Sequence, residues 1–144
     1  MKSFPILLVD DDALDVKTVK KSFQMARLPH PLFVARDGVD ALDFLRHRGH
    51  YANYSDEEAP RPGLILLDLK MPRLDGFGLL RELKNDGILS LLPTVVLTTS
   101  REEGDRIESY RLGIAGYIVK PLAFSDFVEA TRVLGSYWNL CELP

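Results

Sequence analysis

The sequence has one cysteine, one tryptophan and no long apolar stretch, and these shortages exclude several classes of protein. The lone cysteine, Cys141, excludes an internal disulfide and fits the reducing conditions of the cytosol. No run approaches the roughly eighteen apolar residues that a membrane-spanning helix needs. The amino-terminal segment MKSFPILLVDDD becomes acidic too early for a signal peptide. We therefore expect a cytoplasmic protein that does not enter a membrane.

An excess of positive charge is also missing. The chain carries 18 lysines and arginines against 21 acidic residues, which gives a formal net charge of −3. Because binding to a phosphate backbone needs clustered positive charge, we do not expect DNA or RNA as a partner. The length of 144 residues suits one domain, and no repeat or low-complexity tract divides the chain.

The most informative stretch is GLILLDLKMPRLDG, residues 63–76. Its first five residues carry no polar side chain, and the apolar run ends abruptly at Asp68. Such a short run is typical of a strand that is buried on both faces of a parallel sheet. Asp68 is then expected at the carboxyl end of a central strand, where open α/β sheets bind ligands. From this segment alone, Asp68 fits a helix cap, a metal ligand or a nucleophile.

Apolar runs alternate with segments of helical periodicity along the whole chain. Besides residues 63–67, strands are expected at residues 5–9, 32–35, 94–97 and 116–119. Asp37 is expected to cap a helix that ends near Gly49, and Ser125 or Asp126 a final helix that ends at about Tyr137. Five strands alternating with five helices predict an α/β fold with a doubly wound, five-stranded parallel sheet.

Polar side chains follow the apolar runs at strand ends that should meet at one edge of the sheet. They are Asp10, Asp11, Asp68, Thr98 and Lys120. Clustered carboxylates repel one another unless a cation joins them, and their hard oxygen atoms suit Mg²⁺. A lysine ammonium and a threonine hydroxyl can hold phosphate oxygens, and a carboxylate kept ionised between metal and ammonium can attack phosphorus. Each residue alone also fits a structural role, but together they suit an acyl-phosphate site.

Four motifs carry a resemblance to a known family: VDDD at residues 9–12, DLKMPRLDG at 68–76, LTTS at 97–100 and GYIVKP at 116–121. With them the chain resembles, over essentially its full length, the receiver domain of two-component response regulators. The resemblance implies a CheY-like (βα)5 fold with strand order 2-1-3-4-5. It also implies a single receiver domain over residues 1–144, of which residues 139–144 are a C-terminal extension. The tail YWNLCELP, the loop before the central strand and LTTS most resemble small regulators paired with bacterial phytochrome kinases.

The resemblance assigns roles to the residues at the sheet edge. It implies that Asp68 is the phosphoacceptor and that Lys120 contacts the phosphoryl group. Asp11 and Asp68 would bind Mg²⁺ directly, together with the backbone carbonyl of Lys70. Asp10 would act on the metal largely through water. The phosphoryl donor would be a sensor histidine kinase, of the phytochrome type by the narrower resemblance.

The family's switch pair corresponds to Thr98 and Tyr117, through which the phosphorylation signal would be relayed. A protein of this kind is a signalling protein rather than an enzyme, since it catalyses only its own phosphotransfer and autodephosphorylation. Lys70 and Thr99 depart from the smaller or uncharged residues that are common beside the path of the attacking water. These departures concern the lifetime of the phosphoryl group and not its formation.

Four other readings compete with a signalling receiver. A phosphate sink would share its chemistry, and a receiver that binds partners without phosphorylation would lack a key residue, although none is missing here. A haloacid-dehalogenase-like phosphatase needs a second aspartate two residues after the nucleophile, where this chain has Lys70. A flavodoxin-like electron carrier needs a Ser/Thr/Gly-rich phosphate loop where this chain has three aspartates, residues 10–12.

The last helix carries more apolar residues than one buried stripe requires: Phe124, Phe127, Val128, Ala130, Val133, Leu134, Tyr137 and Trp138. An exposed apolar patch marks a partner surface, and identical chains most often pair through a two-fold axis. We expect a homodimer through the fourth helix, last strand, fifth helix and tail. Its interface would contain Tyr117, Phe127, Leu134 and, near the centre, Trp138.

Overall fold

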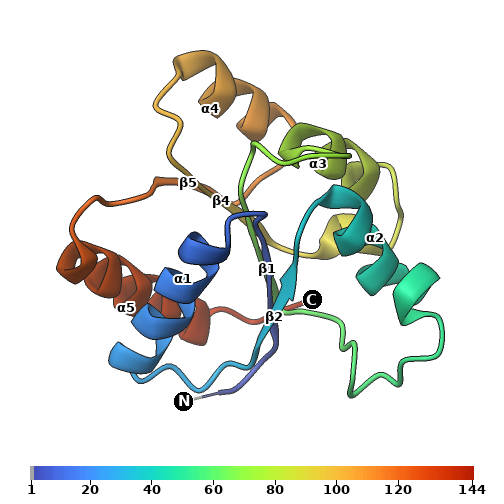
Figure 1. Ribbon diagram of the computed structural model, residues 1–144, viewed down its shortest axis with the longest axis horizontal. Helices are drawn as coiled ribbons and strands as arrows, with labels where there is room; N and C mark the ends of the chain where they lie inside the picture. Colours follow the sequence, from blue (N-terminus) through green and yellow to red (C-terminus); the bar gives the residue numbers. More distant parts are fainter. Residues whose placement is uncertain (1) are drawn as a thin grey trace.

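Five parallel strands form one sheet, and helices cover both of its faces (Figure 1). The computed structural model describes residues 2–144. The strands are β1 (Ile6–Val9), β2 (Leu32–Ala35), β3 (Leu64–Leu67), β4 (Thr94–Thr98) and β5 (Gly116–Val119). Their order across the sheet is β2-β1-β3-β4-β5, and all neighbouring strands are parallel. The predicted fold class and strand order are confirmed.

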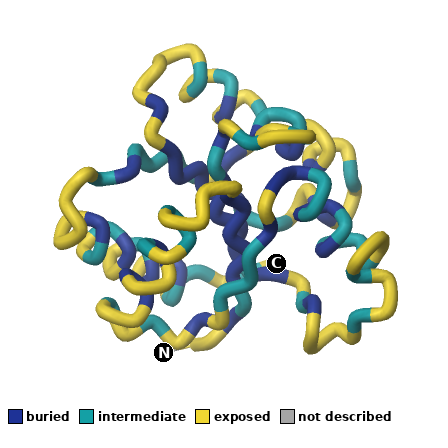
Figure 2. Tube along the Cα trace, viewed as in Figure 1, coloured by how far each residue is buried: buried dark blue, intermediate teal, exposed yellow. Residues whose placement is uncertain are grey.

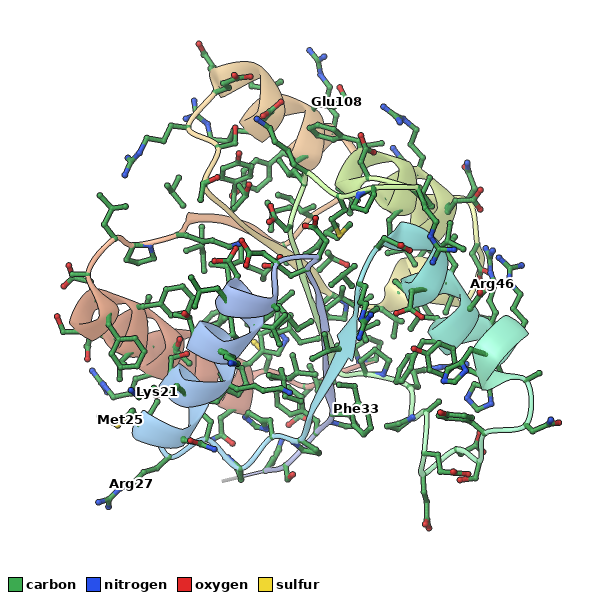
Figure 3. All side chains as sticks on the ribbon, in the orientation of Figure 1. Lys21, Met25, Arg27, Phe33, Arg46 and Glu108 are labelled. Atoms are coloured by element: carbon green, nitrogen blue, oxygen red, sulfur yellow. The ribbon has the colours of Figure 1, made fainter. Side chains whose placement is uncertain are left out.

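The helices form two layers. The α-helices are α1 (Ala13–Met25), α2 (Gly38–Arg46), α3 (Gly76–Lys84), α4 (Glu103–Arg111) and α5 (Phe124–Leu140), and two short 3-10 helices are η1 (Gly49–Tyr51) and η2 (Leu89–Leu91). α1 packs against α5 on one face of the sheet, while α2, α3 and α4 follow one another on the other face (Figure 1). Lys21 of α1 is labelled in Figure 3, and its ammonium lies 5.4 Å from the centroid of the ring of Phe124, the first residue of α5. Among residues 2–144, no helix combines the length and apolarity that crossing a membrane requires.

The sheet has an apolar core on each face. Every strand contributes side chains to both cores, because successive side chains point to opposite faces of the sheet. In β1, Ile6 and Leu8 belong to the core under α1 and α5, whereas Leu7 and Val9 belong to the core under α2 and α3. Burial is greatest along the central strands and decreases toward the outer sides of the helices (Figure 2). A fully buried leucine or valine contributes roughly 2 kcal/mol to folding, so these apolar runs anchor the sheet. The polar residues that follow them are thereby held at its edge.

Aspartates begin three of the helices. The carboxylate of Asp12 accepts hydrogen bonds from backbone N–H groups at the start of α1, and Asp37 and Asp75 do the same for α2 and α3. The predicted cap at Asp37 is confirmed. The predicted end of that helix near Gly49 is wrong, because α2 ends at Arg46 and His47 adopts the left-handed conformation with φ of 49°. Histidine is one of the side chains that enter this region more readily than most.

α5 differs from its predicted extent at both ends. It begins at Phe124 after Ala123, with no side-chain hydrogen bond at the cap position, so the expected cap by Ser125 or Asp126 is wrong. It continues beyond Tyr137 to Leu140. The chain then returns to its own domain, where Leu143 packs against the core under α1 and α5. The C-terminal segment therefore lies against the domain and does not project from it.

Candidate functional site

The strand register brings the predicted residues to one edge of the sheet. Val9 lies opposite Leu67 in the pairing of β1 with β3, and the next N–H along, that of Asp68, donates to the Val9 carbonyl at 3.0 Å. Thr98 lies opposite Val119 in the pairing of β4 with β5. The backbone N–H of the following residue, Lys120, donates to the Thr98 carbonyl at 2.7 Å. Asp10 and Asp68 therefore follow adjacent strands, whereas Lys120 follows β5, beyond β4, and its long side chain reaches both carboxylates.

The Lys120 ammonium is the centre of this cluster. Its Nζ donates to Asp15 Oδ2 at 2.7 Å, to Asp10 Oδ2 at 2.9 Å and to Asp68 Oδ2 at 3.2 Å. Asp10 and Lys120 are buried, and Asp68 is half-buried. An ammonium has three N–H donors, so the three carboxylates satisfy all of them.

The acidic residues of the cluster can also hold a metal ion. Asp10, Asp11 and Asp68 each present a carboxylate oxygen, and the three oxygens lie within 4.8 Å of one another. Hard oxygen ligands at this spacing suit a divalent cation such as Mg²⁺ or Mn²⁺. With Asp15, the cluster holds four carboxylates and one ammonium, that of Lys120, which leaves three negative charges (four minus one) uncompensated. The donor set and its charge therefore fit a bound cation.

Burial and the neighbouring polar groups have opposite effects on the pKa of each buried member of the cluster, Asp10 and Lys120. Burial raises the pKa of Asp10 above its ordinary value of 3.8, and its hydrogen bonds from the Asp12 N–H and from Lys120 offset this only in part. Burial alone would lower the pKa of Lys120, but the hydrogen bonds to Asp15 and Asp10 and the charge of Asp68 outweigh it, so that its pKa is raised. The lysine is therefore held firmly as the ammonium, the form that can bind a phosphate oxygen.

The residues of the expected switch pair meet at Ser100. Thr98 is buried at the end of β4, and its hydroxyl accepts a hydrogen bond from the Ser100 N–H at 3.3 Å. Tyr117 is half-buried in β5, and its hydroxyl donates to the Ser100 carbonyl at 3.0 Å. The Ser100 hydroxyl in turn donates to Asp105 Oδ2 at 2.6 Å, which ties the loop to α4. No sequence signal singled out Ser100 as the link between these two side chains.

An ion pair that the sequence analysis missed fixes the loop after Asp68. Arg73 Nε donates to Asp37 Oδ2 at 2.7 Å and Arg73 Nη2 to Asp37 Oδ1 at 3.1 Å. Burial alone would raise the pKa of Asp37, but the hydrogen bonds from Arg73 and from the Asp40 N–H outweigh it and lower the pKa. Next to this pair, the Gly38 N–H donates to the Leu74 carbonyl at 2.8 Å. A Cβ on Gly38 would lie 2.6 Å from that carbonyl oxygen, so only glycine permits this contact.

Two residues of the expected dimer interface lie inside the domain. Phe127 and Trp138 are each only 7% exposed, and both belong to the core under α1 and α5. Leu134 is half-buried against the same core, and Tyr117 packs against the core on the other face. The expectation that Trp138 forms the centre of an interface is corrected: the buried stripe of α5 is wider than the sequence analysis allowed, because the C-terminal tail covers part of it.

The architecture is that of a receiver domain. The family model of the response regulator receiver domain matches residues 6–132, and the chain belongs to that family. The response regulator Rcp1 of Synechocystis sp. is 39% identical over 133 residues, which cover 92% of this chain and 87% of Rcp1. The predicted resemblance, including its phytochrome-linked branch, is confirmed.

Solved structures give the same assignment. The structure of the phosphorylated cyanobacterial phytochrome response regulator RcpA has a TM-score of 0.87 and 36% identity, and the match covers 99% of both chains. The Mn²⁺-bound form of Rcp1 has a TM-score of 0.86 at 38% identity and covers 98% of this chain and 99% of that one. RPA3017, a response regulator in red light signalling of R. palustris, has a TM-score of 0.88 at 36% identity over 97% and 98% of the two chains. This protein is therefore a signalling protein related to phytochrome-associated response regulators.

Proposed function

We propose that this protein accepts a phosphoryl group on Asp68 from a sensor histidine kinase of the phytochrome type, in a Mg²⁺-dependent reaction in the cytoplasm. The observation that carries the proposal is the convergence of Asp10, Asp11 and Asp68 beside the Lys120 ammonium. The similarity to regulators solved in phosphorylated and Mn²⁺-bound forms supports both the modification and the metal. The similarity to RcpA and RPA3017 supports a kinase of the phytochrome type.

In the proposed reaction, a carboxylate oxygen of Asp68 forms a bond to phosphorus while the P–N bond of the donor phosphohistidine breaks. The electron pair of that bond stays on the imidazole nitrogen of the kinase. Mg²⁺ held by Asp10, Asp11, Asp68 and the Lys70 carbonyl would neutralise charge on the transferred group. Lys120 exchanges its longest hydrogen bond, the one to Asp68 at 3.2 Å, for a phosphoryl oxygen. Its contact with Asp15 holds the ammonium at the site meanwhile.

The experiment is transfer from an autophosphorylated phytochrome-type kinase, followed by intact-mass measurement of this protein. We expect one phosphoryl group per chain when Mg²⁺ is present and none when the metal is chelated. Because chelation could also inhibit the kinase, acetyl phosphate serves as a second donor that needs no partner. Labelling that is equally fast with and without the metal would contradict the proposed site.

The switch proposal follows from the contacts of Ser100. A phosphoryl oxygen on Asp68 would draw the Thr98 hydroxyl toward it and away from the Ser100 N–H. The Ser100 carbonyl, which holds the Tyr117 hydroxyl, lies in the same loop, so the two changes are coupled. A local charge would thus alter the surface formed by α4 and β5.

Thr98→Ala is expected to be phosphorylated but to lose the response of Tyr117. Thr98→Ser, which retains the hydroxyl, should keep both. The readout is the NMR signal of Tyr117, labelled in its ring, with and without beryllofluoride. A Tyr117 signal that changes equally in Thr98→Ala and in the wild type would contradict the coupling.

We also propose self-association through the edge of the sheet at β5. β5 is an edge strand and is half-buried throughout, and the flanking helices expose large apolar side chains: Ile107 and Tyr110 on α4, and Val133, Tyr137 and Leu140 on α5. We expect these exposed side chains, and not the buried Trp138, to form the contact between the two chains.

The dimer is tested by sedimentation of the wild type and of Tyr137→Glu, with and without beryllofluoride. We expect the substitution to weaken association about tenfold or more, because it places a charge in an apolar contact. Met25→Glu, at an exposed apolar residue of α1, is the matched control and should sediment like the wild type. A wild type that stays monomeric at high micromolar concentration in both states would contradict the interface.

A further inference from the structure

Asp15 has the shortest hydrogen bond to the Lys120 ammonium, although it belongs neither to the proposed metal ligands nor to the phosphoacceptor. It lies in the first turn of α1, where its backbone N–H donates to the cap carboxylate of Asp12 at 3.3 Å. Its side chain is about one-third exposed, whereas that of Lys120 is 7% exposed. The contact therefore joins a helix on one face of the sheet to the buried lysine of the site.

The three carboxylates around Lys120 differ in what they would do when the site is loaded. Asp10 and Asp68 would turn toward the metal, and Asp68 would carry the phosphoryl group. Asp15 has no other hydrogen-bond partner for its carboxylate among the described contacts, and its backbone is fixed by the α1 cap. It therefore keeps its hold on Lys120 while the other two contacts change.

We infer that Asp15 is a positioning residue that anchors Lys120 and draws part of its charge away from the phosphoryl group. The inference rests on the proposed phosphorylation of Asp68. A carboxylate 2.7 Å from the ammonium competes with any phosphoryl oxygen for the same positive charge. It also adds a negative charge close to an anionic group. Asp15 thus weakens the hold on the phosphoryl group and strengthens the attraction for the metal ion.

The charge of Asp15 should have opposite effects on the affinity of the site for Mg²⁺ and on its affinity for a phosphoryl analogue. Without that charge, the site attracts Mg²⁺ less strongly, because one negative charge near the cation is gone. The hold on a phosphoryl analogue should become stronger, because Lys120 no longer shares its charge with Asp15. A residue with a merely structural role would weaken both when replaced, so the opposite signs identify a positioning role.

The test uses Asp15→Asn, which keeps the shape and the acceptor oxygen but loses the charge. Affinity for Mg²⁺ is measured by titration calorimetry, and affinity for beryllofluoride at saturating Mg²⁺ by fluorine NMR. We expect Mg²⁺ to bind roughly two- to fivefold more weakly and beryllofluoride roughly two- to fivefold more tightly, the range for one partly exposed ion pair. Asp12→Asn is the matched control: asparagine still caps α1, and the residue has no described contact with Lys120.

The outcomes separate this inference from the proposed function. A wild type that binds no beryllofluoride in the presence of Mg²⁺ contradicts phosphorylation at Asp68 itself. If the wild type binds it and Asp15→Asn binds it equally or more weakly, only the role of Asp15 is overturned. The same shift in Asp12→Asn as in Asp15→Asn would assign the effect to general charge and would also overturn the anchoring contact.

Discussion

Replacing Asp68 with asparagine is expected to reduce phosphoryl labelling to background while leaving the fold intact. The amide has nearly the same shape as the carboxylate, but it lacks the negative charge and the nucleophilic oxygen that attack phosphorus requires. Lys120 retains its hydrogen bonds to Asp10 and Asp15, so its ammonium does not become a buried unpaired charge. The measurement is intact mass after incubation with the kinase or with acetyl phosphate and Mg²⁺.

Asp12→Asn provides the comparison for this experiment as well, since it makes the same chemical change at the same edge of the sheet. It should be labelled like the wild type, because the Asp12 carboxylate caps α1 and takes no part in the proposed reaction. Unfolding in urea shows that each variant is folded. Labelling of Asp68→Asn at the wild-type rate would remove Asp68 as the phosphoacceptor and with it the proposed function.

The sheet could be predicted because each strand has a direct sequence signal. β1 and β3 are short, uninterrupted apolar runs, which are typical of a strand buried on both faces. Once the strands are parallel, their carboxyl ends share one edge, where the long side chain of Lys120 can reach Asp10 and Asp68. The pairing of Lys120 with Asp10 and Asp68 could therefore be predicted from the sequence.

Other contacts of the site depend on features that the sequence does not display. Asp15 reaches Lys120 only because α1 packs on the sheet at one particular rotation, which is set by the packing of Val19 and Phe23 in the core. Arg73 reaches Asp37 from a backbone with φ of 63°, a conformation that nothing about arginine predicts. Both contacts depend on tertiary packing, which the apolar periodicity of a single segment does not reveal.

The incorrect prediction that Trp138 lies at a dimer interface has a similar cause. A helix that is apolar over most of its circumference can face either a partner or a segment of its own chain, and its sequence is the same in both cases. Here the segment after α5 returns to the domain, and Leu143 fills the space beside Gly63 that a Cβ would otherwise occupy. Trp138 packs into the core formed with Phe4 and Leu64. The residue is a core residue, and its replacement should affect folding before it affects assembly.

Trp138→Ala is therefore expected to lower the free energy of unfolding by about 3–5 kcal/mol, the usual cost of removing a large buried aromatic side chain. Tyr137→Ala, at the adjacent and 58% exposed position, should cost less than about 1 kcal/mol. Trp138→Phe should fall between them, since the ring still fills most of the space and the indole N–H has no hydrogen-bond partner in the described structure. Urea unfolding followed by circular dichroism measures all three. If Trp138→Ala were as stable as Tyr137→Ala and only its sedimentation changed, the tryptophan would belong to an interface after all.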